Sequence, residues 1–354
     1  MPTSVVDRDE TTATDGRWIQ DLAQGKPPVT VVVPCRQEER QIGRCLEAVL
    51  KQDVETPFEL LVVDGMSTDR TRKIVEEVAS RDPRVRLLDN PHGTVSPAMN
   101  IGIREATGDF IVRVDGHCLI PHDYIRQVLH AFRESGAECV GGSMVAEGDS
   151  YWGSIIACAT STAFGMGGQR FHGRGEPQYM DTVYLGAYPK RVLLALGLYD
   201  ERFVRNQDDE LNYRLRSKGG RVYFTPKIWA AYTTRATLRK LVSQYAQYGW
   251  WKVLVYRKHP SLLQFRHLVP AGFLMVLVAT LLLSITLGGN TWWLPVGLLG
   301  AYLTTGAVSS LYEGVSLVRL PSVLFTCWLI HMSYGAGFLA GLMSLPFSVG
   351  AARD

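Results

Sequence analysis

Three carboxylates stand where apolar runs of the sequence end. Glu38, Asp64 and Asp115 each close or shortly follow a run rich in β-branched residues. The runs are Val29–Pro34, Phe58–Asp64 and Phe110–Val114. Parallel strands end at one edge of their sheet, where ligands bind. We therefore expect the three carboxylates to converge there, although a lone acidic residue in such a place is more often a turn former.

Asp115 and His117 flank a glycine just past the third run. Side chains two residues apart in an extended segment point the same way, so both can face one ion. A carboxylate with an imidazole suits a divalent cation, Mn²⁺ or Mg²⁺, that also holds phosphate oxygens. A turn that carries a surface histidine is an equally good reading of these residues alone.

The acidic segment QDDE at 207–210 opens a helical stretch. The helix dipole favours acidic residues at a helix start, and for Asp209 and Glu210 we adopt that interpretation. Arg214 and Arg216 follow on the same helix. They either add positive charge near a diphosphate or, as we favour, form a solvated helix face.

Strands and helices alternate between residues 29 and 142. Predicted strands are Val29–Pro34, Phe58–Asp64, Val85–Leu88, Phe110–Val114 and Glu138–Gly142. Predicted helices are Arg40–Gln52, Thr68–Ser80, Ser96–Thr107 and Pro121–Ser135. Ser67 and Thr68 are cap candidates for the second helix. This alternation predicts an α/β fold with a mostly parallel sheet.

The net charge of +3 over 354 residues conceals three differently charged regions. Residues 1–210 hold 23 Lys and Arg against 32 Asp and Glu, whereas residues 211–267 hold 12 basic residues and no acidic one. Residues 268–349 hold only Glu313 and Arg319. The composition excludes a disordered chain, a collagen-like fibre and a disulfide scaffold. The apolar block predicts a membrane anchor rather than a purely soluble protein.

Three apolar runs follow one another in the last quarter of the chain. Leu268–Leu287 and Trp292–Tyr312 are each long enough to cross a hydrocarbon core of about 30 Å, and Leu320–Phe347 is the third run. The positive-inside rule places the basic residues before the first run, and Arg319, in the cytoplasm. Three spans would leave the C-terminus outside. Because glycines and a proline interrupt the third run, a bent or re-entrant segment is the alternative.

The first 28 residues and the cysteines bear on localisation. Residues 1–28 lack an apolar run, so we expect no secretory signal peptide and a soluble domain on the cytoplasmic side of the plasma membrane. The six cysteines form no Cys-x-x-Cys pair, which suits a reducing compartment and argues against a structural metal site.

Residues 235–258 combine apolar positions at helical spacing with basic residues and the pair Trp250 and Trp251. This pattern predicts an amphipathic helix in the headgroup layer, attracted to anionic lipid. A helix packed on the domain formed by residues 29–232 is the alternative.

Four stretches, taken together, resemble a family 2 glycosyltransferase of the GT-A fold. They are VVVPCRQEE, VVDGMSTDRT, NIGIREATGDFIVRVDGH and LGAYPKRVLLALGLYDERFVRNQDDELNYRLRSKGG. The last stretch, and Asp-Gly-His in place of the usual Asp-x-Asp, most resemble membrane-anchored bacterial exopolysaccharide transferases of the succinoglycan-biosynthesis type. The resemblance covers about residues 29–230.

The resemblance implies a role for each matching residue. Pro34, Arg36, Glu38, Asp64 and Asp115 would bind the nucleotide sugar, and Asp115 and His117 would bind the metal and the diphosphate. Asp208 would be the catalytic base. Gly186 and Ala187 would contact the acceptor. We add Trp250 and Trp251 to the predicted acceptor site. Two residues depart from the pattern. Gln207 stands where many relatives have Glu, and His117 favours Mn²⁺ over Mg²⁺ because imidazole suits the softer ion.

The predicted function is inverting, metal-dependent sugar transfer from a nucleotide-diphosphate sugar, UDP-hexose by expectation, to a polyprenyl-linked glycan in exopolysaccharide or cell-surface glycan synthesis. Processive synthases of the family carry Gln-x-x-Arg-Trp, whereas residues 247–251 read QYGWW, which argues against polymer extrusion. The alternatives are transfer to polyprenyl phosphate itself and a non-catalytic membrane scaffold. Membrane lipids are expected partners, nucleic acid is not, and a homo-oligomer is left open.

The predicted organisation has four parts: a flexible tail (1–28), a glycosyltransferase domain (29–232), a basic juxtamembrane region (233–267) and a transmembrane region of about three helices (268–349).

Overall fold

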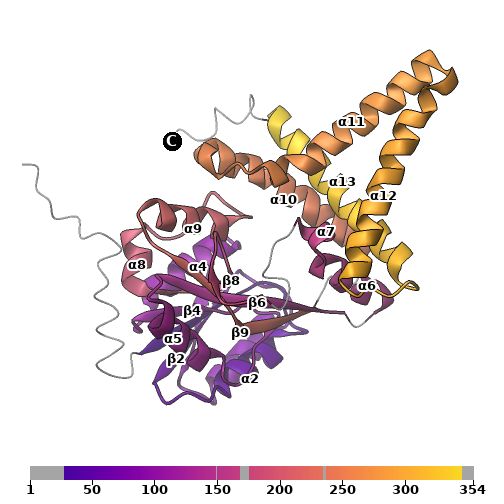
Figure 1. The fold of residues 1–354 in the computed structure, drawn as a ribbon. Helices are drawn as coiled ribbons and strands as arrows, with labels where there is room; N and C mark the ends of the chain where they lie inside the picture. Colours follow the sequence, from indigo (N-terminus) through magenta and orange to yellow (C-terminus); the bar gives the residue numbers. More distant parts are fainter. Residues whose placement is uncertain (1–27, 149, 168–174, 234–236, 345–354) are drawn as a thin grey trace, which may run out of the picture. The chain divides into compact units, whose positions relative to one another are not determined.

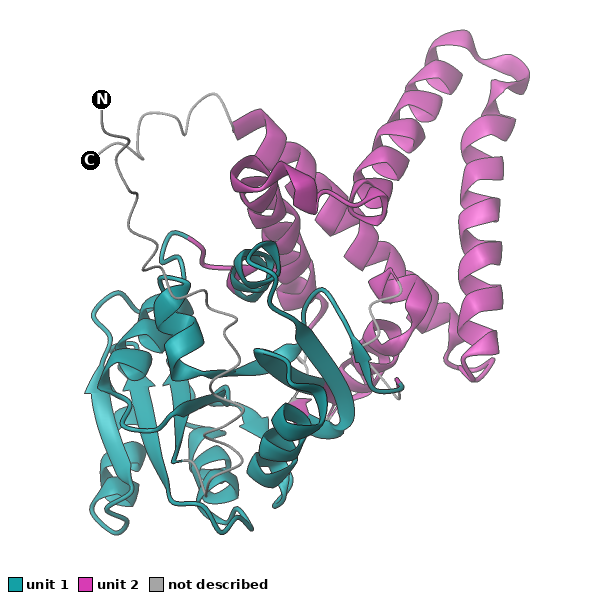
Figure 2. Cartoon of the chain, turned by 60° about the vertical axis from the view of Figure 1, so that its left-hand side comes forward, with its two compact units in different colours: residues 1–142, 176–202, 208–229 teal, residues 143–175, 203–207, 230–354 magenta. Residues whose placement is uncertain are grey.

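The computed structural model describes residues 28–148, 150–167, 175–233 and 237–344. The chain divides into two compact units, drawn in different colours in Figure 2. The first unit comprises residues 1–142, 176–202 and 208–229, and the second comprises 143–175, 203–207 and 230–354. The predicted four-part boundaries stay a prediction, and parts of the predicted tail, juxtamembrane region and C-terminal end lie outside the described residues.

The described strands form one nine-stranded sheet (Figure 1). Their order is β3-β2-β1-β4-β8-β6-β9-β5, with β7 paired to β9. Their bounds are β1 Val29–Cys35, β2 Phe58–Asp64, β3 Val85–Asp89, β4 Phe110–Arg113, β5 Cys118–Leu119, β6 Cys139–Glu147, β7 Gln178–Tyr179, β8 Tyr184–Pro189 and β9 Val222–Thr233. β1 runs parallel to β2 and β4, and β2 runs parallel to β3, which confirms the parallel arrangement. β8, which the sequence analysis did not predict, is antiparallel to β4 and β6.

Six helices accompany these strands. They are α2 Ile42–Leu50, α3 Thr71–Ala79, α4 Val95–Glu105, α5 Tyr124–Ser135, α8 Lys190–Ala195 and α9 Gln207–Ser217. The predicted start of α3 was wrong. Asp69 accepts a hydrogen bond from the backbone N–H of Thr71 at 2.9 Å, whereas Ser67, a predicted cap, binds Asp64. The helix therefore begins at Thr71, three residues after the predicted start.

The second unit is helical apart from its strand ends. Its helices are α6 Tyr151–Ser161, α7 Ala163–Met166, α10 Leu238–Lys258, α11 Phe265–Leu287, α12 Trp293–Tyr312 and α13 Leu320–Ser344, with short 3-10 turns η1 Pro260–Leu262 and η2 Gly289–Trp292. Three stretches are long and apolar enough to cross a membrane, namely α11, η2 with α12, and α13, as the three predicted runs implied. The described part of the third run is one continuous helix.

Helix α10 carries the predicted basic amphipathic segment, and its buried face packs on α13. Leu241 and Tyr245 share a cluster with Ile330, and Val253 shares one with Phe338. Glycine makes the approach close, because a Cβ at Gly337 would collide with the backbone of α10 at Ala246.

Helices α6 and α7 were not predicted. Residues 151–167 carry no charge and mix small with apolar types, so they lack a clear periodicity. Ile155 of α6 packs with Val323 and Cys327 of α13. The ring of Phe164 on α7 lies 5.3 Å from that of His331. These two helices therefore belong with the apolar helices of the second unit.

Candidate active site at the strand ends

The parallel strands end in register. Cys35, the last residue of β1, pairs with Asp64, the last residue of β2, and Val32 of β1 pairs with Arg113 at the end of β4. β1 is buried along its whole length, as its β-branched sequence VTVVVPC favours. The buried strands therefore fix where the polar loops that follow them begin.

Arg113 joins two of the predicted site residues. Its Nε and Nη2 donate to the two carboxylate oxygens of Asp115 at 2.7 and 3.2 Å. Its Nη1 donates to both oxygens of Asp208 at 2.8 and 3.0 Å. The arginine side chain is 6% exposed. One buried guanidinium thus holds the predicted metal ligand and the predicted base together.

Arg113 was not among the predicted site residues. An arginine inside the otherwise apolar run FIVRV is unusual, because arginine is almost never fully buried unless it is paired. It also stands two residues before Asp115, so strand geometry places both side chains on one face. Those two signals together would have identified it.

Burial and neighbouring charges set the protonation of this cluster. Burial alone would lower the pKa of the Arg113 guanidinium, but Asp115 and Asp208 raise it well above its ordinary value. Burial raises the pKa of Asp208, Arg113 opposes that rise, and Asp115 and Asp209 add to it. The Asp208 side chain is 35% exposed, and its two hydrogen bonds to Arg113 hold it in a fixed orientation.

Glu38 contacts the predicted metal ligand. Its Oε1 lies 2.9 Å from Nδ1 of His117. Its backbone N–H donates to Oγ1 of Thr71 at 2.7 Å, which fixes the loop after β1. A carboxylate on one ring nitrogen orients a histidine so that the other nitrogen can bind a metal. The geometry therefore relates Glu38 to the metal motif, whereas the resemblance placed it in the loop that meets the nucleoside.

A divalent cation fits part of this cluster. Ligand atoms of Asp115, His117 and Cys118 lie within 4.8 Å of one another. Burial raises the pKa of the Cys118 thiol to about 12, and its Sγ lies 3.1 Å from the hydroxyl of Tyr184. Because a cysteine sulfur is a soft ligand that suits Zn²⁺ or Cu⁺ better than Mn²⁺ or Mg²⁺, Cys118 does not suit this role. One carboxylate and one imidazole remain, a donor set that suits Mn²⁺.

Asp64, predicted to bind the nucleoside, is fully buried. Its carboxylate accepts from the backbone N–H and the hydroxyl of Ser67 at 3.0 and 2.5 Å, and Arg72 lies 3.7 Å away. Nearby, Arg36 Nη1 donates to the carbonyl of Gly93 at 3.2 Å. Pro34 lies within β1, buried with the rest of the strand.

A glutamine ties the first two strand-end loops together. The side chain of Gln37 donates to Thr68 Oγ1 at 3.0 Å and accepts from the backbone N–H of Thr68 at 2.7 Å. Gln37 and Met66 both have positive φ, 58° and 57°, a conformation that is costly for residues other than glycine and clusters at functional sites.

The predicted acceptor residues fall in two places. Gly186 and Ala187 lie on β8 and are buried within the sheet. Trp250 and Trp251 lie on α10 in the second unit, where their rings meet edge to face at 5.0 Å. Their acceptor role stays a prediction.

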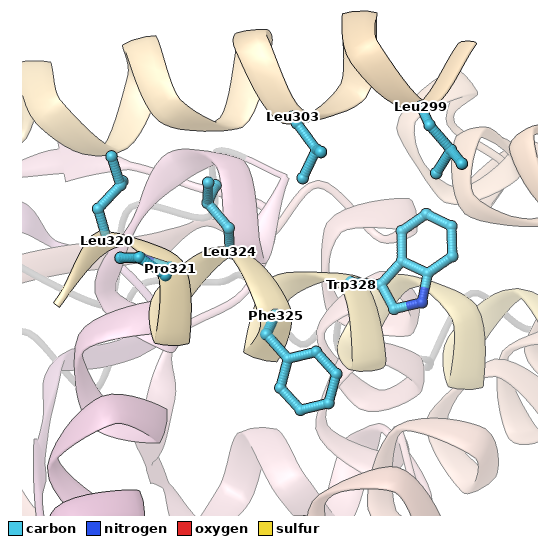
Figure 3. A pocket seen from close by; sticks show the side chains of 7 residues that line it. All are labelled: Leu299, Leu303, Leu320, Pro321, Leu324, Phe325 and Trp328. Carbon is cyan, nitrogen blue, oxygen red and sulfur yellow. The ribbon is translucent and has the colours of Figure 1, made fainter. Parts of the chain in front are cut away.

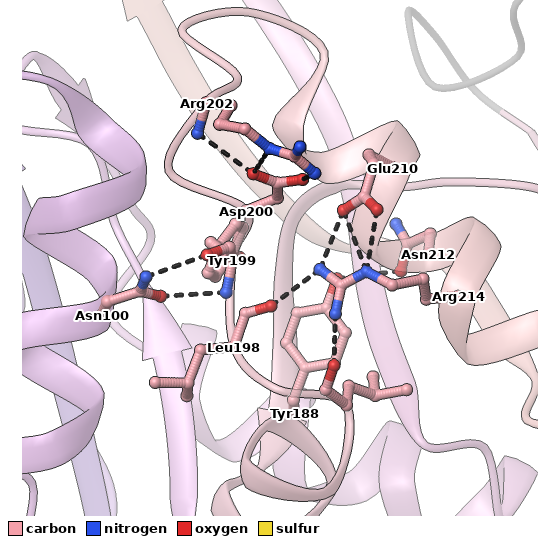
Figure 4. A network of polar contacts seen from close by, with 10 residues as sticks. Asn100, Tyr188, Leu198, Tyr199, Asp200, Arg202, Glu210, Asn212 and Arg214 are labelled. Carbon is pink, nitrogen blue, oxygen red and sulfur yellow. Dashed lines mark hydrogen bonds and ion pairs between the residues drawn. The ribbon is translucent and has the colours of Figure 1, made fainter. Parts of the chain in front are cut away.

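Buried polar contacts support α9, the helix that carries Asp208 in its first turn (Figure 4). Glu210 is fully buried and bonds Arg214, whose Nη2 also donates to the carbonyl of Leu198 at 2.7 Å. Asn212 accepts from the hydroxyl of Tyr188 at 2.8 Å. The interpretation of Arg214 as part of a solvated helix face was therefore wrong, because Glu210 and two backbone carbonyls occupy its guanidinium. A contribution of its charge near a diphosphate stays a prediction.

The segment just before Asp208 belongs to the second unit. There the ring of Phe203 lies 6.5 Å from that of Trp251, and Nζ of Lys258 lies 5.6 Å from the centre of the Phe203 ring. Asn206 contacts the carbonyl of Tyr248 at 3.4 Å. The predicted base thus follows directly, in sequence, a segment packed on α10.

Comparison with known proteins gives a consistent picture. Residues 30–157 match the sequence model of glycosyl transferase family 2. The chain is 28% identical over 321 residues to the succinoglycan biosynthesis protein ExoA of Rhizobium meliloti, which covers 88% of this chain and 94% of that protein. It is 26% identical over 324 residues to dolichyl N-acetyl-alpha-D-glucosaminyl phosphate 3-beta-D-2,3-diacetamido-2,3-dideoxy-beta-D-glucuronosyltransferase of Methanococcus voltae, covering 89% and 97%.

A solved structure supports the fold. The mannosyltransferase PcManGT of Pyrobaculum calidifontis, in complex with GDP-Man and Mn²⁺, aligns with a TM-score of 0.58 at 17% identity, over 93% of this chain and 94% of that one. At this identity the likeness speaks for the architecture alone.

Proposed function

Because the chain carries a family 2 glycosyltransferase domain on a GT-A fold, we propose that it transfers a sugar from a nucleotide-diphosphate sugar to a lipid-linked glycan, with inversion, at the cytoplasmic face of a membrane. The bridge from Asp115 through Arg113 to Asp208 is the observation that carries this proposal. It joins the residue that we propose for metal and diphosphate binding to the residue that we propose as the base, the two groups that a direct displacement requires.

The bonds change in one step. The acceptor oxygen bonds to the anomeric carbon as the bond from that carbon to the diphosphate breaks, and the hydroxyl proton passes to Asp208. A positioned base of this kind contributes ~10²–10⁴-fold to the rate. Attack from the face opposite the leaving group inverts the anomeric centre.

Asp115 and His117 would hold the divalent cation, with Glu38 orienting His117. The bound cation would supply positive charge that stabilises the diphosphate leaving group. Arg113, buried and permanently charged, keeps Asp208 and Asp115 oriented. Mn²⁺ suits a carboxylate–imidazole pair better than Mg²⁺ does.

Two relatives support a lipid-linked acceptor and a role in surface glycans. The name of the Rhizobium protein assigns it to succinoglycan biosynthesis, and that of the Methanococcus protein specifies a dolichyl-phosphate-linked sugar. Helices α11 to α13 would anchor the enzyme beside such an acceptor. UDP-hexose remains our expectation for the donor.

The test uses membranes that contain the full-length protein. They are supplied with a panel of radiolabelled nucleotide sugars, and membranes with an Asp208→Asn chain at equal abundance are the matched control. We expect radiolabel in the lipid fraction from one donor, dependent on Mn²⁺ and absent from the control. Equal labelling by both chains would refute the assignment of the base, and no labelling with any donor would favour the non-catalytic scaffold.

The acceptor is tested separately with polyprenyl phosphate and with a polyprenyl diphosphate-linked glycan. Product from the second compound supports the proposal. Product only from polyprenyl phosphate would favour the alternative reaction, in which the acceptor is already an anion and needs little deprotonation.

A further inference from the structure

Helix α13 is the third helix that is long and apolar enough to cross a bilayer. If α11, α12 and α13 all crossed in turn, the start of α11 and the end of α13 would lie on opposite faces. The hydrocarbon core between those faces is about 30 Å thick. The two ends could not then touch.

The last ten residues of α13 nevertheless contact the start of α11. Phe338 shares a buried cluster with Ala271. A Cβ at Gly335 would lie 2.7 Å from the carbonyl oxygen of Pro270. Since α11 begins at Phe265, both of its contact residues lie in its first two turns. The end of α13 is therefore beside the end of α11 that enters the membrane.

Helix α10 gives the same placement independently. A Cβ at Gly341 would lie 3.0 Å from the carbonyl oxygen of Trp250. Only 11 uncharged residues separate Lys240 from Lys252 in α10, which is ~16 Å of helix and about half of the hydrocarbon core. Because α10 cannot cross, its partner in α13 lies at the same shallow depth.

The start of α13 lies near the end of α12. Val315, in the loop between them, shares a cluster with Val323 of α13 and Ile155 of α6. In the same loop, the carboxylate of Glu313 accepts from the backbone N–H of Ala163 at 3.0 and 3.1 Å. Figures 1 and 2 both show α13 running from the end of α12 toward the start of α11, away from the turn that joins α11 to α12.

A groove between α12 and α13 agrees with this course (Figure 3). It encloses about 410 Å³ and is lined by apolar side chains, among them Leu299 and Leu303 of α12 and Phe325 and Trp328 of α13. Two adjacent spans packed along their lengths would fill such a space with side chains. The groove instead indicates that α13 diverges from α12.

The fraction of buried residues also distinguishes α13 from α11 and α12. In its most apolar stretch, 17% of α11 is buried, as is 17% of η2 with α12, whereas 39% of α13 is buried. α11 and α12 therefore present the larger apolar surface to lipid.

We infer that only α11 and α12 cross the bilayer, as a hairpin whose turn at 288–292 lies on the far side, while α13 lies with α6, α7 and α10 as a platform in the near interfacial layer. The platform's partner is the lipid surface of that interfacial layer. Arg257, Lys258, Arg266 and Arg319 would all meet anionic headgroups there, and the C-terminus would end on that side. This inference concerns membrane attachment and does not depend on the proposed transfer.

The test uses the full chain in intact cells and a membrane-impermeant thiol reagent. Three variants are compared with the parent chain, whose six cysteines set the background: Asn290→Cys in the hairpin turn, Ser261→Cys between α10 and α11, and a cysteine added after Asp354. We expect the Asn290→Cys chain to be labelled in intact cells, and the other two only after lysis.

Each other pattern overturns the inference. Labelling of both the turn and the C-terminal cysteine in intact cells would mean three crossings. Labelling of neither would mean that the hairpin does not cross. Ser261→Cys is the matched control for the near side, because it must react only after lysis under either topology.

Discussion

The two units join distant parts of the chain by opposite physical means. In the first, Arg113 binds two carboxylates, those of Asp115, two residues further along the chain, and of Asp208, 95 residues further along. In the second, Gly337 lets the backbone of α13 touch that of α10 without any charge. Burying ions costs free energy that attraction only partly offsets, whereas close backbone packing adds contacts without desolvating a charge. The comparison teaches that buried ion pairs connect the distant residues of the first unit, whereas close packing at a glycine connects those of the second.

The largest expected effect comes from Asp208→Asn. The amide keeps the shape of the carboxylate but cannot accept the proton, so the turnover should fall by ~10²–10⁴-fold. Nucleotide-sugar affinity, measured by calorimetry, should stay within a few-fold. Residual turnover above a tenth of the parent value would mean that Asp208 is not the base.

Replacing Arg113 tests the ion pairs that it forms with Asp115 and Asp208. Arg113→Met leaves Asp115 and Asp208 without their shared cation and should lower the free energy of unfolding by ~3–5 kcal/mol. Arg126→Met, which removes an exposed arginine from its pair with Asp53, is the matched control and should cost ~0–1 kcal/mol. Similar costs in chemical unfolding would remove the distinction between the two kinds of pair.

The contact between Glu38 and His117 should matter less. Glu38→Gln removes the carboxylate that orients the imidazole, so Mn²⁺ affinity should fall by ~10–100-fold. Paramagnetic resonance of free Mn²⁺ measures this directly. Glu47→Gln, at an exposed ion pair, is the control and should leave the affinity unchanged; an unchanged affinity in both variants would separate Glu38 from the metal site.

The smallest effect is expected at the glycine contact. Gly337→Ala forces α13 away from α10 and should cost ~1–3 kcal/mol through overpacking. Gly297→Ala on α12, where no atom lies within 4 Å of an added Cβ, is the matched control and should be neutral or slightly stabilising. Thermal unfolding in detergent compares them, and equal midpoints would contradict the close packing.

Much of the first unit could be predicted because its signals are local. β2 has the predicted bounds, Phe58–Asp64, and β1 extends the predicted run by only one residue. Buried parallel strands are continuous apolar runs, which sequence shows directly. The same logic placed Asp64 and Asp115 at strand ends.

What could not be predicted depends on partners far along the chain. β8 pairs with β4 across more than 70 residues, and α6 packs on α13. The local sequence of β8 or of α6 therefore does not show what stabilises it. The role of Arg113 was hidden for the same reason, since one of its two carboxylates comes from α9. Contacts between residues far apart in the sequence, rather than weak secondary-structure propensity, limited what could be predicted from the sequence.

The segments 143–175 and 203–207 belong to the second unit, although the stretches of chain that flank them belong to the first. The polypeptide changes unit five times, after residues 142, 175, 202, 207 and 229. No single cut in the gene can therefore separate an enzyme from its anchor. A shortened protein ending at residue 232 would retain Ile155 and Phe164 but lose the helices that cover them, and it should aggregate rather than dissolve. Any expressed or engineered form of this protein must therefore contain both units.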